Sequence, residues 1–197
     1  MINFEPYVGG TYFNKKTKIL VLGESHYFNE EDLKSFLNDA GKMRNVTKNV
    51  LDDYKNYKLG YVKYAKWMNT FTKFCNVFTD RKNSNVELIE FWNKVSFYNY
   101  VQFPTRGPRQ SPTKEEFEIS FSAFTDVLKE LEPDIIYIWG KRLWNNIQKE
   151  SLIKLDEIDY LNLHKKIPVH VVFHPSSTKF NYTSSKAIKD YFERVFN

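Results

Sequence analysis

Four short apolar segments, rich in β-branched and aromatic residues, constrain the fold of this chain most strongly. They span residues 18–23, 95–101, 134–140 and 169–174. Near-continuous apolar runs of this length are typical of strands buried on both faces of a parallel sheet. Helical patterns occupy the intervals, and strands that alternate with helices form a sheet covered on both faces. We therefore predict an α/β three-layer sandwich in which helices flank a central, mostly parallel four-stranded sheet.

The clearest helical pattern covers residues 113–131. Thr113 has the chemistry of an N-cap, and Glu115 and Glu116 suit the first turn of the helix. Apolar residues then recur at helical spacing until Pro133 stops the helix. We expect a shorter helix over residues 141–149, a closing helix over 184–196, and several helical pieces over 30–92.

The bulk composition indicates one globular domain over residues 1–197. Cys75 is the single cysteine, which excludes an internal disulfide and fits a reducing compartment. No basic segment followed by an apolar run opens the sequence, and no apolar run approaches the ~18 residues of a membrane span. We expect a cytoplasmic monomer that contacts no membrane. The net charge of +5 permits attraction to a phosphate backbone.

Each predicted strand ends in or near polar residues. Glu24 and His26 follow the first strand, and Asn99 lies in the second. Trp139 to Arg142 close the third strand, and His174 and Ser176 follow the fourth. Sites in open α/β sheets form beyond the carboxyl ends of the strands. We therefore expect these four strand ends to converge on one site.

The segment Gly23-Glu24-Ser25-His26-Tyr27 has two interpretations. Glu24 can orient a water, act as a base or stabilise a developing cation, and His26 can exchange a proton near neutral pH. Alternatively, Glu24 caps a following helix, because the N-terminal dipole of a helix favours an anion. The five residues alone do not decide between a catalytic and a capping role.

The segment His174-Pro175-Ser176-Ser177 is the second candidate for chemistry. Proline fixes the backbone after His174, and serines can donate hydrogen bonds to phosphate. A lone histidine at a strand end is often structural, but its place opposite the first motif favours a functional role. Asn99 can bond neighbouring backbone or read a base edge, because an amide offers both a donor and an acceptor.

Further basic and aromatic residues are candidates for contacts with nucleic acid. Arg106 and Arg109 lie in a proline-punctuated loop that is either a solvated rigid connection or a phosphate clamp. Lys179 and Phe180 can insert into a duplex or pack in the core. With one cysteine and no standard spacing among the histidines, we predict no metal site. The absence of a phosphate-binding glycine loop or dinucleotide fingerprint argues against a nucleotide cofactor.

Taken in order, these motifs resemble the uracil-DNA glycosylase superfamily. That family places a Gly-x-x-x-Tyr or related motif after its first core strand, then an Asn-containing strand, a strand ending in Trp-Gly, and a strand ending in His-Pro-Ser. The corresponding segments here are 23–27, 99–101, 139–140 and 174–176, so the resemblance spans roughly residues 18–180. Ser25 and His26 depart from it, because the best-known members carry Asp and Pro at these positions.

The resemblance implies an enzyme that flips a deaminated or modified base out of DNA and hydrolyses its N-glycosidic bond. Asn99 would pair with the base, Tyr27 would shape the pocket, and Phe28 is the candidate for stacking. His174 would stabilise charge on the leaving base, with Glu24 as the local carboxylate and His26 as an added acid–base group. Contacts with DNA would come from Arg106, Arg109, Ser176, Ser177, Lys179 and Phe180. No cofactor or iron–sulfur cluster is implied.

Two alternatives remain open at this point. The Gly-Glu-x-His pattern is also similar to the motif of erythromycin-esterase-like hydrolases and related metal-dependent proteins, in which Glu24 and His26 would activate water. That group leaves Asn99 and the His-Pro-Ser segment without a role. The second alternative is a non-catalytic relative of the glycosylases that binds nucleic acid without excising a base.

Overall fold

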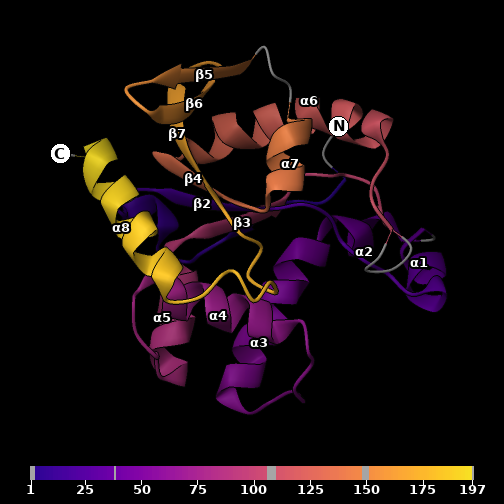
Figure 1. Ribbon diagram of the computed structural model, residues 1–197. Helices are drawn as coiled ribbons and strands as arrows, with labels where there is room; N and C mark the ends of the chain where they lie inside the picture. The colour runs from indigo at the N-terminus through magenta and orange to yellow at the C-terminus, as the bar shows by residue number, and fades with distance from the viewer. Residues whose placement is uncertain (1–2, 38, 106–109, 148–150, 197) are drawn as a thin grey trace.

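The computed structural model describes residues 3–37, 39–105, 110–147 and 151–196 (Figure 1). Seven strands form one mixed sheet in the order β1-β3-β2-β4-β7-β6-β5. The strands are β1 (Tyr7–Val8), β2 (Ile19–Gly23), β3 (Ser96–Asn99), β4 (Ile135–Trp139), β5 (Leu152–Leu155), β6 (Ile158–Asn162) and β7 (Lys166–Val172). The α/β class is confirmed.

The four segments predicted as strands are β2, β3, β4 and β7, and they lie side by side in the sheet. The neighbouring pairs β3–β2, β2–β4 and β4–β7 are all parallel. The prediction of a four-stranded, mostly parallel sheet was nevertheless wrong, because three further strands pair antiparallel. β1 extends the β3 edge, while β6 and β5 extend the β7 edge.

Alternating side chains of the central strands divide the core into two apolar layers. Leu20 and Leu22 pack on one face of β2, and Val21 packs on the other, as the period of two requires. The first face lies under α6 (Lys114–Leu131) and α7 (Lys141–Asn146). The second lies against α3 (Val46–Leu59), α4 (Met68–Phe78), α5 (Asn85–Lys94) and α8 (Thr183–Phe196). Figure 1 shows α6 and α7 on one side of the sheet and α3, α4 and α5 on the other.

The remaining helices are η1 (Tyr12–Asn14), α1 (Glu30–Leu37) and α2 (Ala40–Arg44). The α6 prediction is confirmed in detail. Thr113 and Glu116 form a reciprocal capping box, and the helix ends at Glu132 in a left-handed conformation immediately before Pro133. Within the described parts of the chain, no helix combines the length and apolar character needed to cross a bilayer.

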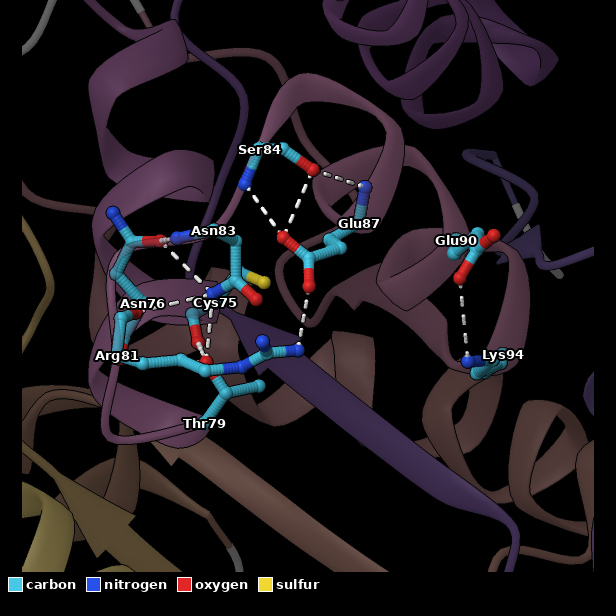
Figure 2. A network of polar contacts seen from close by, with 9 residues as sticks. All are labelled: Cys75, Asn76, Thr79, Arg81, Asn83, Ser84, Glu87, Glu90 and Lys94. Atoms are coloured by element: carbon cyan, nitrogen blue, oxygen red, sulfur yellow. Dashed lines mark hydrogen bonds and ion pairs between the residues drawn. The ribbon is translucent and has the colours of Figure 1, made fainter.

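A polar network connects the end of α4 with the start of α5 (Figure 2). The Nδ2 group of Asn83 donates to Oδ1 of Asn76 at 3.0 Å and to Oγ1 of Thr79 at 2.7 Å, both on the last turns of α4. Ser84 then begins α5 with a capping box to Glu87, which also binds Arg81 at 2.8 Å. The turn thereby joins α4 to α5, and both helices contribute aromatic residues to the core layer on one face of the sheet.

We predict that Asn83→Ala lowers the free energy of unfolding by about 1–3 kcal/mol, because it removes the hydrogen bonds that the buried side-chain amide of Asn83 donates to Asn76 and Thr79. Urea denaturation of the variant and the wild type measures the difference. Asn85→Ala, at the exposed first position of α5, is the matched control and should change stability by less than about 0.5 kcal/mol. Equal effects of both substitutions would contradict this role for Asn83.

Candidate functional site

A cleft of about 850 Å³ lies at the carboxyl ends of the parallel strands. β2 lies between β3 and β4, so the chain connections from its neighbours diverge there. Such a switch point is where open α/β sheets bind ligands. The cleft gathers most of the predicted site residues, namely Glu24, His26, Tyr27, Asn99, His174, Ser176 and Ser177. The expected convergence of the four strand ends is confirmed.

Glu24 is buried at the end of β2 and forms a bidentate ion pair with Arg142 on α7. The Nε group of Arg142 donates to one carboxylate oxygen at 2.8 Å, and one terminal nitrogen donates to the other oxygen. The second terminal nitrogen donates to Oγ of Ser111 at 2.6 Å. The carboxylate and the Tyr27 hydroxyl raise the pKa of Arg142, so the guanidinium stays charged. Glu24 therefore does not cap a helix.

Gly23 allows Asn99 to lie across the end of β2. The two residues are paired in the parallel ladder between β2 and β3. A Cβ atom at position 23 would overlap Oδ1 of Asn99 and lie 2.9 Å from Cζ of Phe97. Glycine is required at this position because the amide occupies the space of a side chain.

The side-chain amide of Asn99 has no hydrogen-bond partner among the described residues, although only 7% of Asn99 is exposed. The backbone carbonyl of Asn99 is bonded, because it accepts from Nε2 of Gln102 at 3.0 Å. The amide instead lines the cleft. Because its donor and acceptor are not used within the described part of the protein, the amide can bond a ligand that enters the cleft.

The loop after β7 fixes the tautomer of His174. The backbone N–H of Ser176 donates to Nδ1 of His174 at 3.2 Å, and Oγ of Ser176 lies 2.7 Å from the same nitrogen. Since a backbone N–H only donates, Nδ1 is the acceptor and the proton of the neutral ring is on Nε2. Desolvation lowers the pKa of His174. The nearby Glu24 carboxylate acts in the opposite direction, and the Arg142 guanidinium lowers the pKa further. The ring presents a neutral N–H donor at the cleft.

His26 has different surroundings from those expected of an acid–base group. Its Nε2 shares a 2.8 Å hydrogen bond with Oγ1 of Thr47, and its ring packs edge-on against Phe4 at 5.1 Å. Burial lowers the pKa of His26 to about 3. The ring is therefore neutral throughout the physiological range, and the predicted proton exchange near neutral pH does not fit this environment.

Aromatic side chains that the sequence did not single out form the walls of the cleft. Trp67, Phe71, Phe97 and Phe173 line it, whereas Phe28 packs with Phe4 and Val46 in a separate cluster. The predicted stacking role of Phe28 therefore has no support in the geometry. The high aromatic content of the sequence suggests that such walls can form. It does not identify the rings that form them, because many aromatic residues belong to the core.

Exposed lysines lie at the rim of the cleft near the His-Pro-Ser loop. The ammonium groups of Lys141 and Lys179 lie 5.9 and 5.8 Å from the ring centroid of Phe173. Lys73 of α4 donates to the backbone carbonyl of Ser177 at 2.6 Å and so holds the loop in place. Arg106 and Arg109, predicted as phosphate contacts, lie outside the described residues.

Phe180 cannot act as a duplex wedge in this structure. It is 0% exposed and stacks on Phe74 of α4 with ring centroids 6.0 Å apart. The sequence interpretation in which Phe180 packs in the core is therefore confirmed, and the insertion role is wrong. The reason is that the loop turns inward after Ser177 before α8 begins.

Among the residues that the structure describes, no three His, Cys, Asp or Glu side chains gather as ligands of one metal ion. Neither a protein-family model nor a curated protein sequence matches this chain. The arguments about its function therefore come from the cleft itself and from the motifs that line it.

We predict that Phe180→Ala destabilises the protein by about 3–5 kcal/mol, because it leaves a cavity between α4 and the loop after β7. Phe173→Ala is the comparison and should cost clearly less, because that ring is 41% exposed whereas Phe180 is fully buried. Guanidinium denaturation measures both. Comparable values for the two variants would contradict the core position of Phe180.

We also predict that His26 does not titrate between pH ~8 and ~5, since its pKa is about 3. Folding favours the neutral ring, so His26 contributes stability that is fully present above pH ~6.5, the pKa expected in the unfolded chain. That stability is lost progressively as the pH falls towards about 3. Imidazole NMR resonances assigned with His26→Gln report the titration directly. A midpoint near pH 6.5 would contradict the burial of this ring.

Proposed function

We propose that this chain is a monomeric, monofunctional DNA glycosylase that hydrolyses the N-glycosidic bond of a flipped, uracil-like base. The single observation that carries the proposal is the unpaired amide of Asn99 in a cleft that also presents the Nε2–H group of His174. An amide offers one donor and one acceptor edge, which is the pattern needed to pair with an imide-type base edge. Aromatic walls supply surfaces for stacking the base.

Cleavage of the bond places negative charge on the departing base and positive charge on the sugar. His174 can stabilise the negative charge on the base, because its neutral Nε2–H group can donate to a base oxygen as that oxygen becomes an anion. The role is electrostatic and requires no proton transfer from the ring. The bond electrons leave with the base. A water then adds to the sugar carbon and loses a proton, which neutralises the charge of the departed base through the solvent.

Glu24 is the candidate for stabilising the sugar cation and orienting the water. Arg142 uses one lone pair on each carboxylate oxygen, and an ionised carboxylate offers about four such sites. The remaining sites can accept a hydrogen bond from water. The ion pair holds the carboxylate in a fixed orientation, which favours positioning over proton abstraction.

The Arg142–Glu24 pair also favours a second candidate, a protein that binds nucleic acid without excising a base. A guanidinium beside the carboxylate offsets its charge and weakens its effect on a sugar cation. The Gly-Glu-x-His hydrolase has no comparable support, because Glu24 bonds Arg142 while His26 bonds Thr47. Neither side chain is left to act with the other on a single water.

A screen over oligonucleotides with deaminated or otherwise modified bases separates the two candidates. The glycosylase should leave alkali-labile abasic sites at one or more of these bases. Retained binding with steep salt dependence, and no excision from any member of the panel, would identify a binding protein instead. Ester hydrolysis that depends on added metal would instead favour the Gly-Glu-x-His group.

We predict that Asn99→Ala, His174→Ala and Glu24→Gln each reduce single-turnover excision by about 10²–10³-fold. Asn162→Ala, at the exposed end of β6, and His164→Ala, in the turn after it, are matched controls outside the cleft lining and should leave the rate unchanged. Unchanged rates for both His174→Ala and Glu24→Gln would refute this assignment of the site.

The same assay tests the protonation state of His174. Its pKa lies below the ordinary value, and protonation would consume the Nδ1 lone pair that accepts from Ser176. The wild-type rate should therefore be constant around neutral pH and fall on acidification through the pKa of His174. A rate that rises on acidification would indicate that the charged ring is the active form.

A further inference from the structure

The connection between α3 and α4 alternates exposed aromatic and basic side chains. Tyr61, Tyr64 and Trp67 follow one another at intervals of three residues and are 78%, 50% and 39% exposed. Lys63 and Lys66, between them, are also exposed. Single exposed aromatic residues are normal on a protein surface, whereas three in seven residues with interleaved lysines form a distinct surface.

Two of the three rings are held in place by the adjoining helices. The hydroxyl of Tyr64 accepts from Nδ2 of Asn69 at 2.6 Å, and its ring lies 5.6 Å from that of Tyr57 on α3. Trp67 packs edge-on against Phe71 with ring centroids 5.8 Å apart. A preorganised surface loses little conformational entropy when it binds a partner.

This surface is continuous with the cleft described above. Trp67 lines the cleft together with Thr70 and Phe71 of α4. The connection runs from the end of α3 to the start of α4 (Figure 1). Trp67 therefore belongs both to the cleft and to the connection that carries Tyr61 and Tyr64.

We propose that residues 61–67 bind single-stranded DNA that flanks the nucleotide in the cleft, with bases stacked on Tyr61, Tyr64 and Trp67. Lys63 and Lys66 contact the intervening phosphates. The proposal rests on the proposed function, because it takes the occupant of the cleft to be a nucleotide. Single strands are the partner because their base faces are free to stack, whereas a duplex offers only its edges and backbone. The interleaved lysines match the charge of the strand.

The first test measures binding of the full chain to a fluorescein-labelled, unmodified oligothymidylate of about 16 nucleotides by anisotropy. Tyr61→Ala should weaken binding by about 5- to 150-fold, the range expected for one stacked base. Phe13→Ala is the control, because Phe13 is another exposed ring, 60% exposed, on η1 before the amino end of β2. It should leave the dissociation constant unchanged. Unchanged binding by Tyr61→Ala would overturn the proposal.

The second test uses the fluorescence of Trp67, since Trp92 and Trp139 are buried and Trp144 of α7 packs, partly buried, on the opposite face of the sheet. Addition of oligothymidylate should quench the tryptophan emission. Trp67→Phe should lose most of that quenching but bind within a few-fold of the wild type, because phenylalanine retains a ring for stacking. Undiminished quenching in Trp67→Phe would place the bound strand elsewhere and refute the assignment.

The third test measures the salt dependence of the same binding. Lys63→Gln and Lys66→Gln should each reduce the slope of log K against log salt by about 0.7. Lys16→Gln, next to η1, is the control and should leave the slope unchanged. A duplex of the same sequence should bind more weakly and be insensitive to Tyr61→Ala. Tighter duplex binding that depends on Tyr61 would also overturn the proposal.

Failure of this proposal is distinguishable from failure of the proposed function. Excision that survives in Tyr61→Ala, together with unchanged binding, would reject the surface and retain the glycosylase. Loss of binding in Tyr61→Ala, in a protein that excises no base from the panel, would retain the surface and reject the catalytic assignment.

Discussion

The pairing of β2 with a parallel neighbour on each side is the constraint on which the site depends. β2 hydrogen-bonds to β3 and to β4 along its length, and its side chains contribute to both apolar layers. The chain connections that follow β2 and its neighbours therefore diverge, and a cleft forms at the carboxyl end of β2. Glu24, Asn99 and Arg142 meet there because each follows or ends one of these three strands.

Close approach at this strand end needs one position without a side chain. Gly23 provides it, and the amide of Asn99 takes the space that a Cβ atom would fill. The ladder register that pairs Gly23 with Asn99 is set by the apolar residues before them, because a slip of one residue would reverse every side chain of β2. Packing in the core thus determines where the amide of the cleft lies.

The sequence predicted the central strands and the longest helix because their signals are strong and local. β2 and β4 are apolar on both faces, and the capping box of α6 can be read from Thr113 and Glu116. β1, β5 and β6 lacked such a signal. β1 has only two residues, and β5 carries the exposed Lys154 and Leu155, so its burial resembles that of a loop.

The location of the candidate site could be predicted from the sequence, whereas the contacts between its side chains could not. Strand ends brought Glu24, Asn99 and His174 together as expected. The partners of Glu24 and His26 are 118 and 21 residues away in sequence, and no local pattern indicates them. Phe180 illustrates the same limit, since only the inward turn of its loop distinguishes a core ring from a surface wedge.

The distribution of charge in and around the cleft connects these observations. Inside it, Glu24 and Arg142 offset one another, Asn99 is uncharged, and the lowered pKa of His174 keeps its ring neutral. The neighbouring positive charges belong to the exposed lysines beside Phe173 and in residues 61–67. The ligand that we propose is divided in the same way, because a uracil-like base is neutral and planar, whereas the phosphates that flank it are charged. A nearly neutral, aromatic interior with a basic rim favours a ligand that has an uncharged planar part and charged flanking groups. A free anion would gain little binding free energy by entering this interior.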